Sequence, residues 1–373
     1  MAELVSSLAG RRILVTGSTG FKGSWLCLAL ARAGAEVTGL ALDPPTEPSL
    51  FDRAGIGDLL VADVRADIRD RVALRRTVAA CRPELVFHLA AQPLVRRSYL
   101  DPAETFDVNV GGTVALLDVL RETGAPSAVL VVTSDKCYLR AAKPGGCTED
   151  DPLGGHDPYS ASKAATEIVA ASYRASFPTL SIATARAGNV VGGGDWAEDR
   201  LVPDAVRALR RNLSIEVRNP QAVRPWQHVL EPVAAYLTLG RRLLDQDPAV
   251  TTAFNLGPDP AAAAPVADVV GALVHGWGSG CWHALGRTAG PFEQPLLTLD
   301  SSRAGHVLGW SPVWSLEQTL RRTVDWYRAE PEASSAAVRA RCVADQDAHA
   351  ADAAAAAPTP LPRQRQALIT RTA

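Results

Sequence analysis

Residues 12–23 read RILVTGSTGFKG, and the amphipathic stretch SWLCLALARAGA follows over residues 24–35. An apolar β-branched run, a glycine cluster and then apolar residues at helical spacing predict a strand, a tight turn and a helix. Glycines at Gly17, Gly20 and Gly23 let the backbone turn sharply and approach a pyrophosphate, whose charge the free N–H groups of the helix would meet. The stretch therefore predicts the first unit of a dinucleotide-binding fold.

The alternation of strands and helices continues along the chain. Strands are expected at 36–40, 59–62, 85–89, 128–133 and 180–188, with helices at 72–80, 104–123 and 159–176. Strands that alternate with helices of this length form a parallel sheet with helices on both faces. We therefore expect an α/β protein with a Rossmann-type, doubly wound parallel sheet and a smaller mixed α/β domain at the C-terminal side.

Three segments are expected from the same pattern. Residues 1–188 would mainly form the dinucleotide-binding domain, and residues 189–330 would mainly form the substrate-binding domain, with some strands interchanged between the two. Helices are expected there near 203–212, 229–244 and 314–329. Residues 331–373 are rich in Ala and Pro with little periodicity, so we expect a flexible tail. The alternative is a helical extension that packs on a partner subunit.

Composition excludes several classes of protein. The chain has 373 residues, a net charge of -2 and no basic run, which argues against nucleic-acid binding. No apolar run is long enough to span a bilayer, so no membrane association is expected. The six cysteines are scattered without a C-x-x-C pair, which indicates reduced thiols in a cytoplasmic protein. The histidines lack metal-ligand spacing, so no metal is expected.

Tyr159 and Lys163 form the clearest catalytic motif. Residues four apart lie on one face of a helix, so the Lys163 ammonium could favour the phenolate form of Tyr159. A tyrosine with an unperturbed pKa near 10 is a poor base at neutral pH, and a neighbouring cation lowers that pKa. The spacing therefore predicts that Tyr159 is a general base and that Lys163 assists it.

Polar residues follow the most continuous apolar strand. Ligands bind at the carboxyl ends of the strands in open α/β sheets, so Ser134, Asp135 and Lys136 should face the site. Ser134 could bridge substrate and Tyr159, while Asp135 and Lys136 offer an acid and base pair beyond hydride transfer. The alternative is an ion-paired loop of purely structural role.

Asp43 lies near the end of the second expected strand, twenty residues beyond Gly23. An acidic group there would bind the adenosine ribose and favour NAD over NADP. The alternative is an ordinary surface aspartate.

These motifs together resemble the extended short-chain dehydrogenase/reductase family and, within it, the nucleotide-sugar 4,6-dehydratases. The similarity covers residues 10 to about 328 and includes TGSTGFKG, HLAAQPLVRRSY, TSDKCY, DDPLGGHDPYSASK, RAGNVVGGGDW, DRLVPD and RPWQHVLEP. Members that act on dTDP-glucose usually carry Asp-Glu where this chain has Asp135 and Lys136, and lysine there resembles the branch that acts on CDP-glucose. The chain departs from the family at 139–148, where a different loop follows the TSDKCY motif.

The resemblance assigns roles to matching positions. Ser134, Tyr159 and Lys163 match the catalytic triad of the family. The residues implied in NAD binding are Gly17, Gly20, Phe21, Gly23, Asp67, Ile68, Ala90, Ala91 and Asn109. Those implied in holding the substrate nucleotide are Asn189, Arg200, Arg218, Arg224 and Glu293. Trp196, in a glycine-flanked loop, either lies near the substrate or is a packing residue.

The resemblance also implies a reaction. The C4 hydroxyl is oxidised, water is eliminated across C5 and C6, and hydride returns to C6, so NAD stays bound throughout. A homodimer or homotetramer is usual among such enzymes. The alternatives are a 4-epimerase, which needs only the Ser134, Tyr159 and Lys163 set, and a dinucleotide-binding regulator without catalysis. Asp135 and Lys136 favour the dehydratase.

Overall fold

A seven-stranded parallel sheet forms the centre of the computed structural model, which describes residues 7–124, 128–139, 143, 145–259, 262–286, 297–330 and 333–356. The strands in spatial order are β11 (Ala253–Leu256), β6 (Ser181–Ala187), β5 (Ala128–Val132), β4 (Leu85–His88), β1 (Arg12–Thr16), β2 (Glu36–Ala41) and β3 (Ala62–Arg65). The predicted Rossmann-type sheet is therefore confirmed. Its last strand, β11, comes from a segment distant in sequence from the other six.

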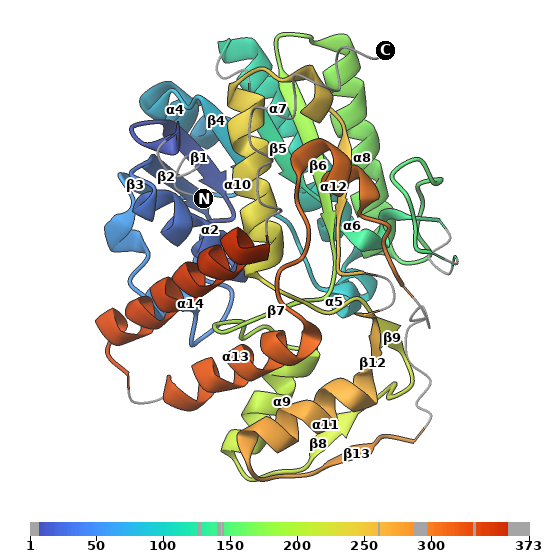
Figure 1. Cartoon of the computed structure of the whole chain (residues 1–373). Coiled ribbons are helices and arrows are strands. Elements are labelled where there is room, and N and C mark those ends of the chain that lie inside the picture. The colour runs from blue at the N-terminus through green and yellow to red at the C-terminus, as the bar shows by residue number, and fades with distance from the viewer. Residues whose placement is uncertain are drawn as a thin grey trace, which may run out of the picture.

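Helices cover both faces of the sheet (Figure 1). Ile13 and Val15 of β1 pack in a core with α2 (Phe21–Arg32) and α10 (Leu230–Leu244). Leu14 points to the opposite face and packs with α4 (Arg71–Cys81), α7 (Gly112–Thr123) and α8 (Pro158–Ser176). Successive side chains of a strand point to opposite faces, so a continuous apolar run is buried on both sides.

Two predicted elements differ from the structure. The third strand is β3 (Ala62–Arg65) rather than 59–62, because 57–59 form a 3-10 turn (Gly57–Leu59) and β3 is a largely exposed edge strand without an apolar signature. The helix expected at 104–123 is divided into α6 (Pro102–Phe106), a π-helical turn (Asp107–Gly111) and α7. The carbonyl of Asn109 in that turn accepts hydrogen bonds from the hydroxyls of Thr113 (2.7 Å) and Thr166 (3.0 Å).

A second lobe lies beyond the carboxyl end of the sheet (Figure 1). It contains α9 (Leu201–Arg210), β8 (Ile215–Val217), α11 (Val266–Trp277) and β13 (Trp282–Ala284). Short pairings join β9 (Val223–Arg224) to β12 (Ala264–Pro265) and β7 (Val190–Val191) to β10 (Gln227–His228). The remaining elements are α3 (Leu50–Arg53), α5 (Val95–Leu100), α12 (Ser302–Leu308), α13 (Leu316–Ala329) and 3-10 turns at Asp135–Cys137 and Pro248–Val250.

The segment after residue 330 contains a helix, whereas the sequence analysis expected a flexible tail. Ser335–Ala356 form a helix, α14, that lies against α2 and α13 of the same chain (Figure 1). Arg339 Nε donates to the carbonyl of Ala54 (2.8 Å), and His349 Nε2 lies 3.1 Å from the buried carboxylate of Glu231. Alanine favours helix, and a buried stripe of Val338, Cys342, Asp345 and His349 recurs at helical spacing. Two members of that stripe are polar, so apolar periodicity does not reveal it.

Candidate active site

A cavity of about 760 Å³ lies between the carboxyl end of the sheet and the second lobe. The segments after β1, β4, β5 and β6 line one side of it, and α9, β8 and β9 line the other. This is the edge at which open α/β sheets bind their ligands. Basic side chains outnumber acidic ones along the wall, and the basic ones are Lys22, Arg96, Lys136, Arg200, Arg207, Arg211, Arg218 and Arg224. The cavity therefore suits an anionic ligand.

The turn after β5 brings three predicted residues, Ser134, Asp135 and Lys136, to the cavity. The Ser134 hydroxyl donates to Asp135 Oδ1 (3.0 Å) and accepts from the Lys136 backbone N–H (3.2 Å). Asp135 is buried, and its Oδ2 has no hydrogen-bond partner among the described residues. Gly188 lies opposite, where a Cβ would be 1.7 Å from that oxygen, so only glycine leaves room for the carboxylate.

Tyr159 and Lys163 both extend from α8, as predicted. Asp157 caps the helix by accepting from the Ser160 N–H (2.9 Å), and Pro158 occupies its first position. Tyr159 lines the cavity, where burial raises its pKa to about 12 and a hydrogen bond with Ser134 acts in the opposite direction. Lys163, one helical turn further on, is buried and its ammonium donates to the Val132 carbonyl (3.3 Å). Because its pKa is about 12, Tyr159 holds its proton at neutral pH.

The pKa of Lys163 predicts the alkaline limit of activity. Burial lowers this pKa to about 8, although the Glu167 carboxylate raises it. Lys163 therefore loses its charge as the pH rises through about 8, and the predicted role of this charge in favouring the Tyr159 phenolate implies that turnover should fall above that pH. Turnover measured from about pH 6 to about pH 10 checks this.

Lys22 provides the control for that measurement, because burial also lowers its pKa to about 8. A Lys22→Met variant should keep the alkaline decline if Lys163 causes it. Loss of the decline in this variant would assign it to Lys22 instead.

The glycine turn after β1 has the shape that a pyrophosphate requires. Gly17 has a φ of +73°, and a Cβ there would be 2.7 Å from the Ala90 nitrogen. A Cβ on Gly23 would be 2.1 Å from the Gly17 carbonyl oxygen. Gly20 caps α2 without a side-chain hydrogen bond, so the first N–H groups of the helix stay available. The residues present therefore fit a bound dinucleotide at this helix end.

The adenosine-side predictions fall after β2 and β3. Asp43 follows β2 with its side chain 91% exposed, and its Oδ1 lies 3.8 Å from Arg65 Nε. Asp67 follows β3, and hydrogen bonds from Arg69 hold its pKa below the usual range. Ile68 beside it is buried, with its side chain close to Gly112 at the start of α7. Asp43 therefore lies at the carboxyl end of β2, which is next to β1, and Asp67 and Ile68 lie at the carboxyl end of β3, one strand further out.

The segment after β4 runs past the glycine turn. Ala90 packs against Gly17 and its N–H donates to the Thr16 hydroxyl (3.3 Å), and Ala91 follows it. Asn109 is buried, and its side chain accepts from the Gln92 N–H (2.8 Å) and donates to the Ser162 hydroxyl (2.8 Å). Asn109 therefore ties the segment after β4 to α8, which is a structural task beside the role implied by resemblance.

Four of the predicted substrate residues line the cavity. Asn189, Arg200, Arg218 and Arg224 all line it. Arg200 pairs with Asp195 (2.9 Å), Arg218 pairs with Asp199 (2.8 Å), and Arg224 is buried and donates to the Val223 carbonyl (2.9 Å). Glu293 lies outside the described residues.

The structure favours the second alternative for Trp196, that of a packing residue. Its ring is buried, packs edge-on against Tyr327 at 5.1 Å and lies under the Arg210 guanidinium at 4.7 Å. The cavity is lined by its neighbour Asp195 instead. The glycines around Trp196 serve tight packing, since a Cβ on Gly193 would overlap the Trp326 ring.

Lys22 and Arg96 are among the cavity residues that the sequence analysis did not predict. Lys22 stands in the first turn of α2, and burial together with Arg200 lowers its pKa while Asp135 and Asp195 raise it. Arg96 pairs with Asp199 (3.1 Å), which also holds Arg218. A cation in the first turn of a helix opposes the helix dipole, and that was the available signal for Lys22. Arg96 had no local signal.

The comparisons with known proteins agree with the fold. Residues 13–257 match the model of the NAD dependent epimerase/dehydratase family, so the chain belongs to this family. The chain is 46% identical over 328 residues to CDP-glucose 4,6-dehydratase of Salmonella typhimurium, covering 86% of this chain and 91% of that protein. It is 32% identical over 327 residues to dTDP-glucose 4,6-dehydratase of Streptomyces griseus, covering 84% and 93%.

Solved structures show the same architecture. The UDP-glucose-4-epimerase of Stenotrophomonas maltophila, solved with NAD and formylated UDP-arabinopyranose, superposes with a TM-score of 0.75 at 25% identity over 86% of this chain and 98% of that one. MoeE5 in complex with UDP-glucose and NAD has a TM-score of 0.72 at 27% identity over 85% and 98%. The family resemblance expected from the motifs is confirmed.

Proposed function

We propose that the protein is a NAD-dependent nucleotide-sugar 4,6-dehydratase that converts CDP-glucose to CDP-4-keto-6-deoxyglucose. The observation that carries the proposal is the Asp135 and Lys136 turn, which lies in the same cavity as Tyr159. A 4-epimerase needs a base at C4, whereas a dehydratase also needs proton transfers at C5 and C6. The 46% identity to a CDP-glucose 4,6-dehydratase supports the choice of substrate.

NAD would be held by the glycine turn and the segments that follow β2, β3 and β4. Gly17, Gly20 and Gly23 leave space for the pyrophosphate, and the N–H groups of α2 face it. When bound, NAD takes a hydride from the sugar and later returns it, so the reaction has no net redox change.

The side chains of the cavity would move the protons. Tyr159, assisted by Lys163, takes the proton of the C4 hydroxyl, and Ser134 holds that hydroxyl in place. The resulting ketone acidifies the C5 hydrogen. Asp135 and Lys136 then take the C5 proton and protonate the departing C6 hydroxyl. Arg218 and Arg224 carry permanent charge and planar donors suited to a diphosphate.

Incubation with CDP-glucose and NAD tests the proposal directly. The expected product has lost one water by mass and shows the base-induced absorbance of a 4-keto sugar. The dTDP-, UDP- and GDP-glucose counterparts serve as competitors, and CDP-glucose should have the highest kcat/KM. An isomer that keeps its water would establish a 4-epimerase instead, and no reaction with any of the four would refute the proposal.

We also infer a homodimer that forms through α5, α6 and α8. Leu100 of α5 is 86% exposed, Ile168 of α8 is 60% exposed and Phe106 of α6 is partly exposed, so these three adjoining helices present an apolar surface. A second copy of the chain would cover it across a two-fold axis. We expect Ile168→Glu to yield monomers in light scattering, because a buried carboxylate disrupts an apolar interface.

Leu213 is a matched control for the dimer test, since it is 56% exposed on the second lobe, far from these helices in the chain. A Leu213→Glu variant should keep the mass of the unmodified protein. A monomer in the unmodified protein would contradict the proposed dimer.

The proposal also assigns a binding role to each domain and a cellular location to the protein. Residues 1–188 would mainly bind NAD and residues 189–330 the nucleotide sugar, with β11 crossing into the sheet. Among the described residues, every helix is too short or too polar to cross a membrane. All six cysteines are free thiols, which supports a cytoplasmic location.

A further inference from the structure

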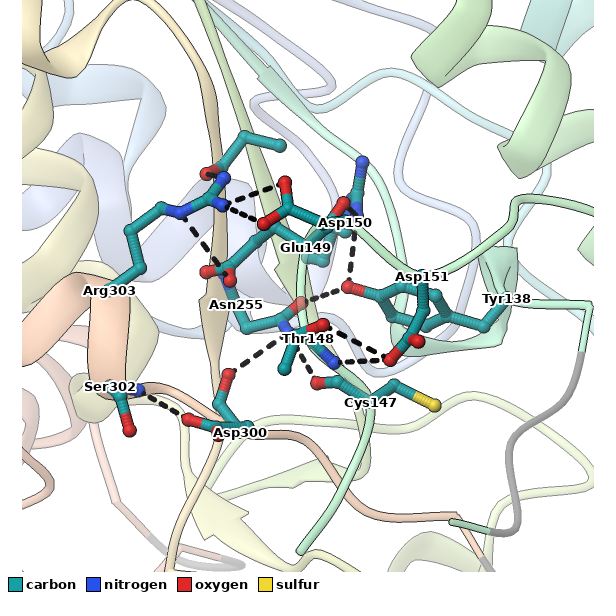
Figure 2. A network of polar contacts seen from close by, with 12 residues as sticks. Tyr138, Cys147, Thr148, Glu149, Asp150, Asp151, Asn255, Asp300, Ser302 and Arg303 are labelled. Carbon is teal, nitrogen blue, oxygen red and sulfur yellow. Dashed lines mark hydrogen bonds and ion pairs between the residues drawn. The ribbon is translucent and has the colours of Figure 1, made fainter.

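Tyr138 closes the turn that carries Asp135 and Lys136, and its side chain is fully buried. Its hydroxyl donates to Asn255 Oδ1 (2.5 Å) (Figure 2). The same hydroxyl accepts from Arg186 Nη1 (2.9 Å). Arg186 belongs to β6 and Asn255 to β11, so one hydroxyl connects the turn to two strands of the sheet. Tyr138 lies outside the cavity lining and cannot touch a substrate there.

The partners of the Tyr138 hydroxyl are themselves held in place. Arg186 is buried and pairs with the buried carboxylate of Glu167 (2.8 Å). Glu167 also accepts hydrogen bonds from the hydroxyls of Thr184 (2.7 Å) and Thr133. Breaking a buried ion pair leaves a charge without compensation, so Arg186 and Glu167 hold each other in place.

Asn255 extends the same support to the altered loop. Its Nδ2 donates to the carbonyls of Cys147 (2.7 Å) and Asp300 (3.0 Å), and its backbone N–H donates to Glu149 Oε1 (2.8 Å) (Figure 2). The Asn255 side chain is fully buried. Tyr138 therefore joins the catalytic turn to a junction of three chain segments.

The Asp135 and Lys136 turn depends on this junction more than Tyr159 does. Ser134 fixes one end of the turn, and Tyr138, with backbone bonds from Leu139 N to Pro152 O (2.9 Å) and from Gly154 N to Cys137 O (2.8 Å), fixes the other. Tyr159 has anchors of its own at the start of α8, since its N–H donates to the Ser98 hydroxyl of α5 (3.1 Å) and Asp157 caps α8.

We propose that Tyr138 is a positioning residue for the elimination of water and has little effect on oxidation at C4. The inference rests on the proposed function. In the elimination, the Asp135 and Lys136 pair takes the C5 proton, the C5–H electrons form the C5–C6 double bond, and the C6–O bond breaks. The departing hydroxyl receives a proton from the pair and leaves as water. Loss of the Tyr138 hydroxyl loosens the pair while Tyr159 keeps its place.

The test is a Tyr138→Phe variant mixed with CDP-glucose and NAD, quenched at short times and examined by mass spectrometry. Three sugar species differ in mass: the substrate, the 4-ketone that retains its water, and the dehydrated product. We expect the ketone that retains its water to accumulate, with elimination slowed on the order of 10-fold. In deuterated water, incorporation of deuterium at C5 should slow by the same factor. Tyr173→Phe, on α8 with its ring against Phe177, is the control and should match the unmodified protein.

The measured quantity is the ratio of the 4-ketone that retains its water to the dehydrated 4-keto product. It counts only molecules that have already oxidised C4, so a partly unfolded preparation leaves it unchanged. A Tyr138→Phe ratio equal to that of the unmodified protein, or an equal slowing of both steps, would overturn the inference. If the unmodified protein forms no ketone from CDP-glucose, the proposed function fails, which is a different result from failure of the Tyr138 inference.

Discussion

Replacement of Tyr159 by Phe is expected to lower turnover of CDP-glucose by roughly 10³-fold, because general base catalysis by a positioned side chain contributes about that much. The ring fills the same space in the variant, so the loss concerns the hydroxyl alone. Burial raises the Tyr159 pKa to about 12 in the protein, so the Lys163 ammonium would have to favour the phenolate during the reaction. Turnover under saturating substrate is the measurement.

Two controls separate chemistry from binding in the Tyr159→Phe variant. Its thermal midpoint and its affinity for NAD should stay close to those of the unmodified protein, since the glycine turn is unchanged. C4 oxidation and water loss should fall together, because elimination follows the ketone. Turnover within about 10-fold of the unmodified protein would refute the role of Tyr159 as base.

Replacement of Lys136 by Met is expected to separate the two half-reactions. The thioether fills a similar volume but carries no proton, so elimination should slow by at least about 10²-fold while the 4-ketone still forms. Mass spectrometry of quenched reactions distinguishes the ketone that retains its water from the dehydrated product. Lys143→Met is the control, because Lys143 is exposed and pairs with Asp151 (2.8 Å) outside the cavity. Dehydrated product at the unmodified rate would exclude Lys136 from the chemistry.

The double variant connects Lys136 to the inference about Tyr138. If Tyr138 acts through the Asp135 and Lys136 turn, Tyr138→Phe should slow elimination less in the Lys136→Met variant than it does in the unmodified protein. Additive effects would mean that Tyr138 acts elsewhere.

The parts of the fold that could be predicted are those in which local sequence and burial agree. Val129, Leu130 and Val131 are buried on both faces of the sheet, so their run is apolar without interruption. β3 is an exposed edge strand, and its polar residues carry no such run. The π-helical turn at Asn109 depends on hydroxyls of Thr113 and Thr166, which no local pattern reveals.

The residues of the candidate site also divide into those that local sequence predicts and those that it does not. Tyr159 and Lys163 are neighbours along one helix, and Gly17, Gly20 and Gly23 lie in one turn, so spacing alone predicts them. Lys22, Arg96 and Tyr138 acquire their places through contacts with residues distant in sequence. The resemblance to a family added Arg218 and Arg224, which line the cavity from the second lobe.

Helix α14 has a consequence for how the molecule melts. It is bonded to Trp25 of α2, to Trp326 of α13 and, through His349, to Glu231 of α10, so it joins the layer around the glycine turn to the C-terminal helices. Opening either part alone would expose this helix and leave the Glu231 carboxylate without its neighbour. Helix α13 in turn packs against α11 of the second lobe. The two lobes should therefore unfold as one cooperative unit, with a single calorimetric transition. A truncated chain that ends before Ser335 should show two separate calorimetric transitions.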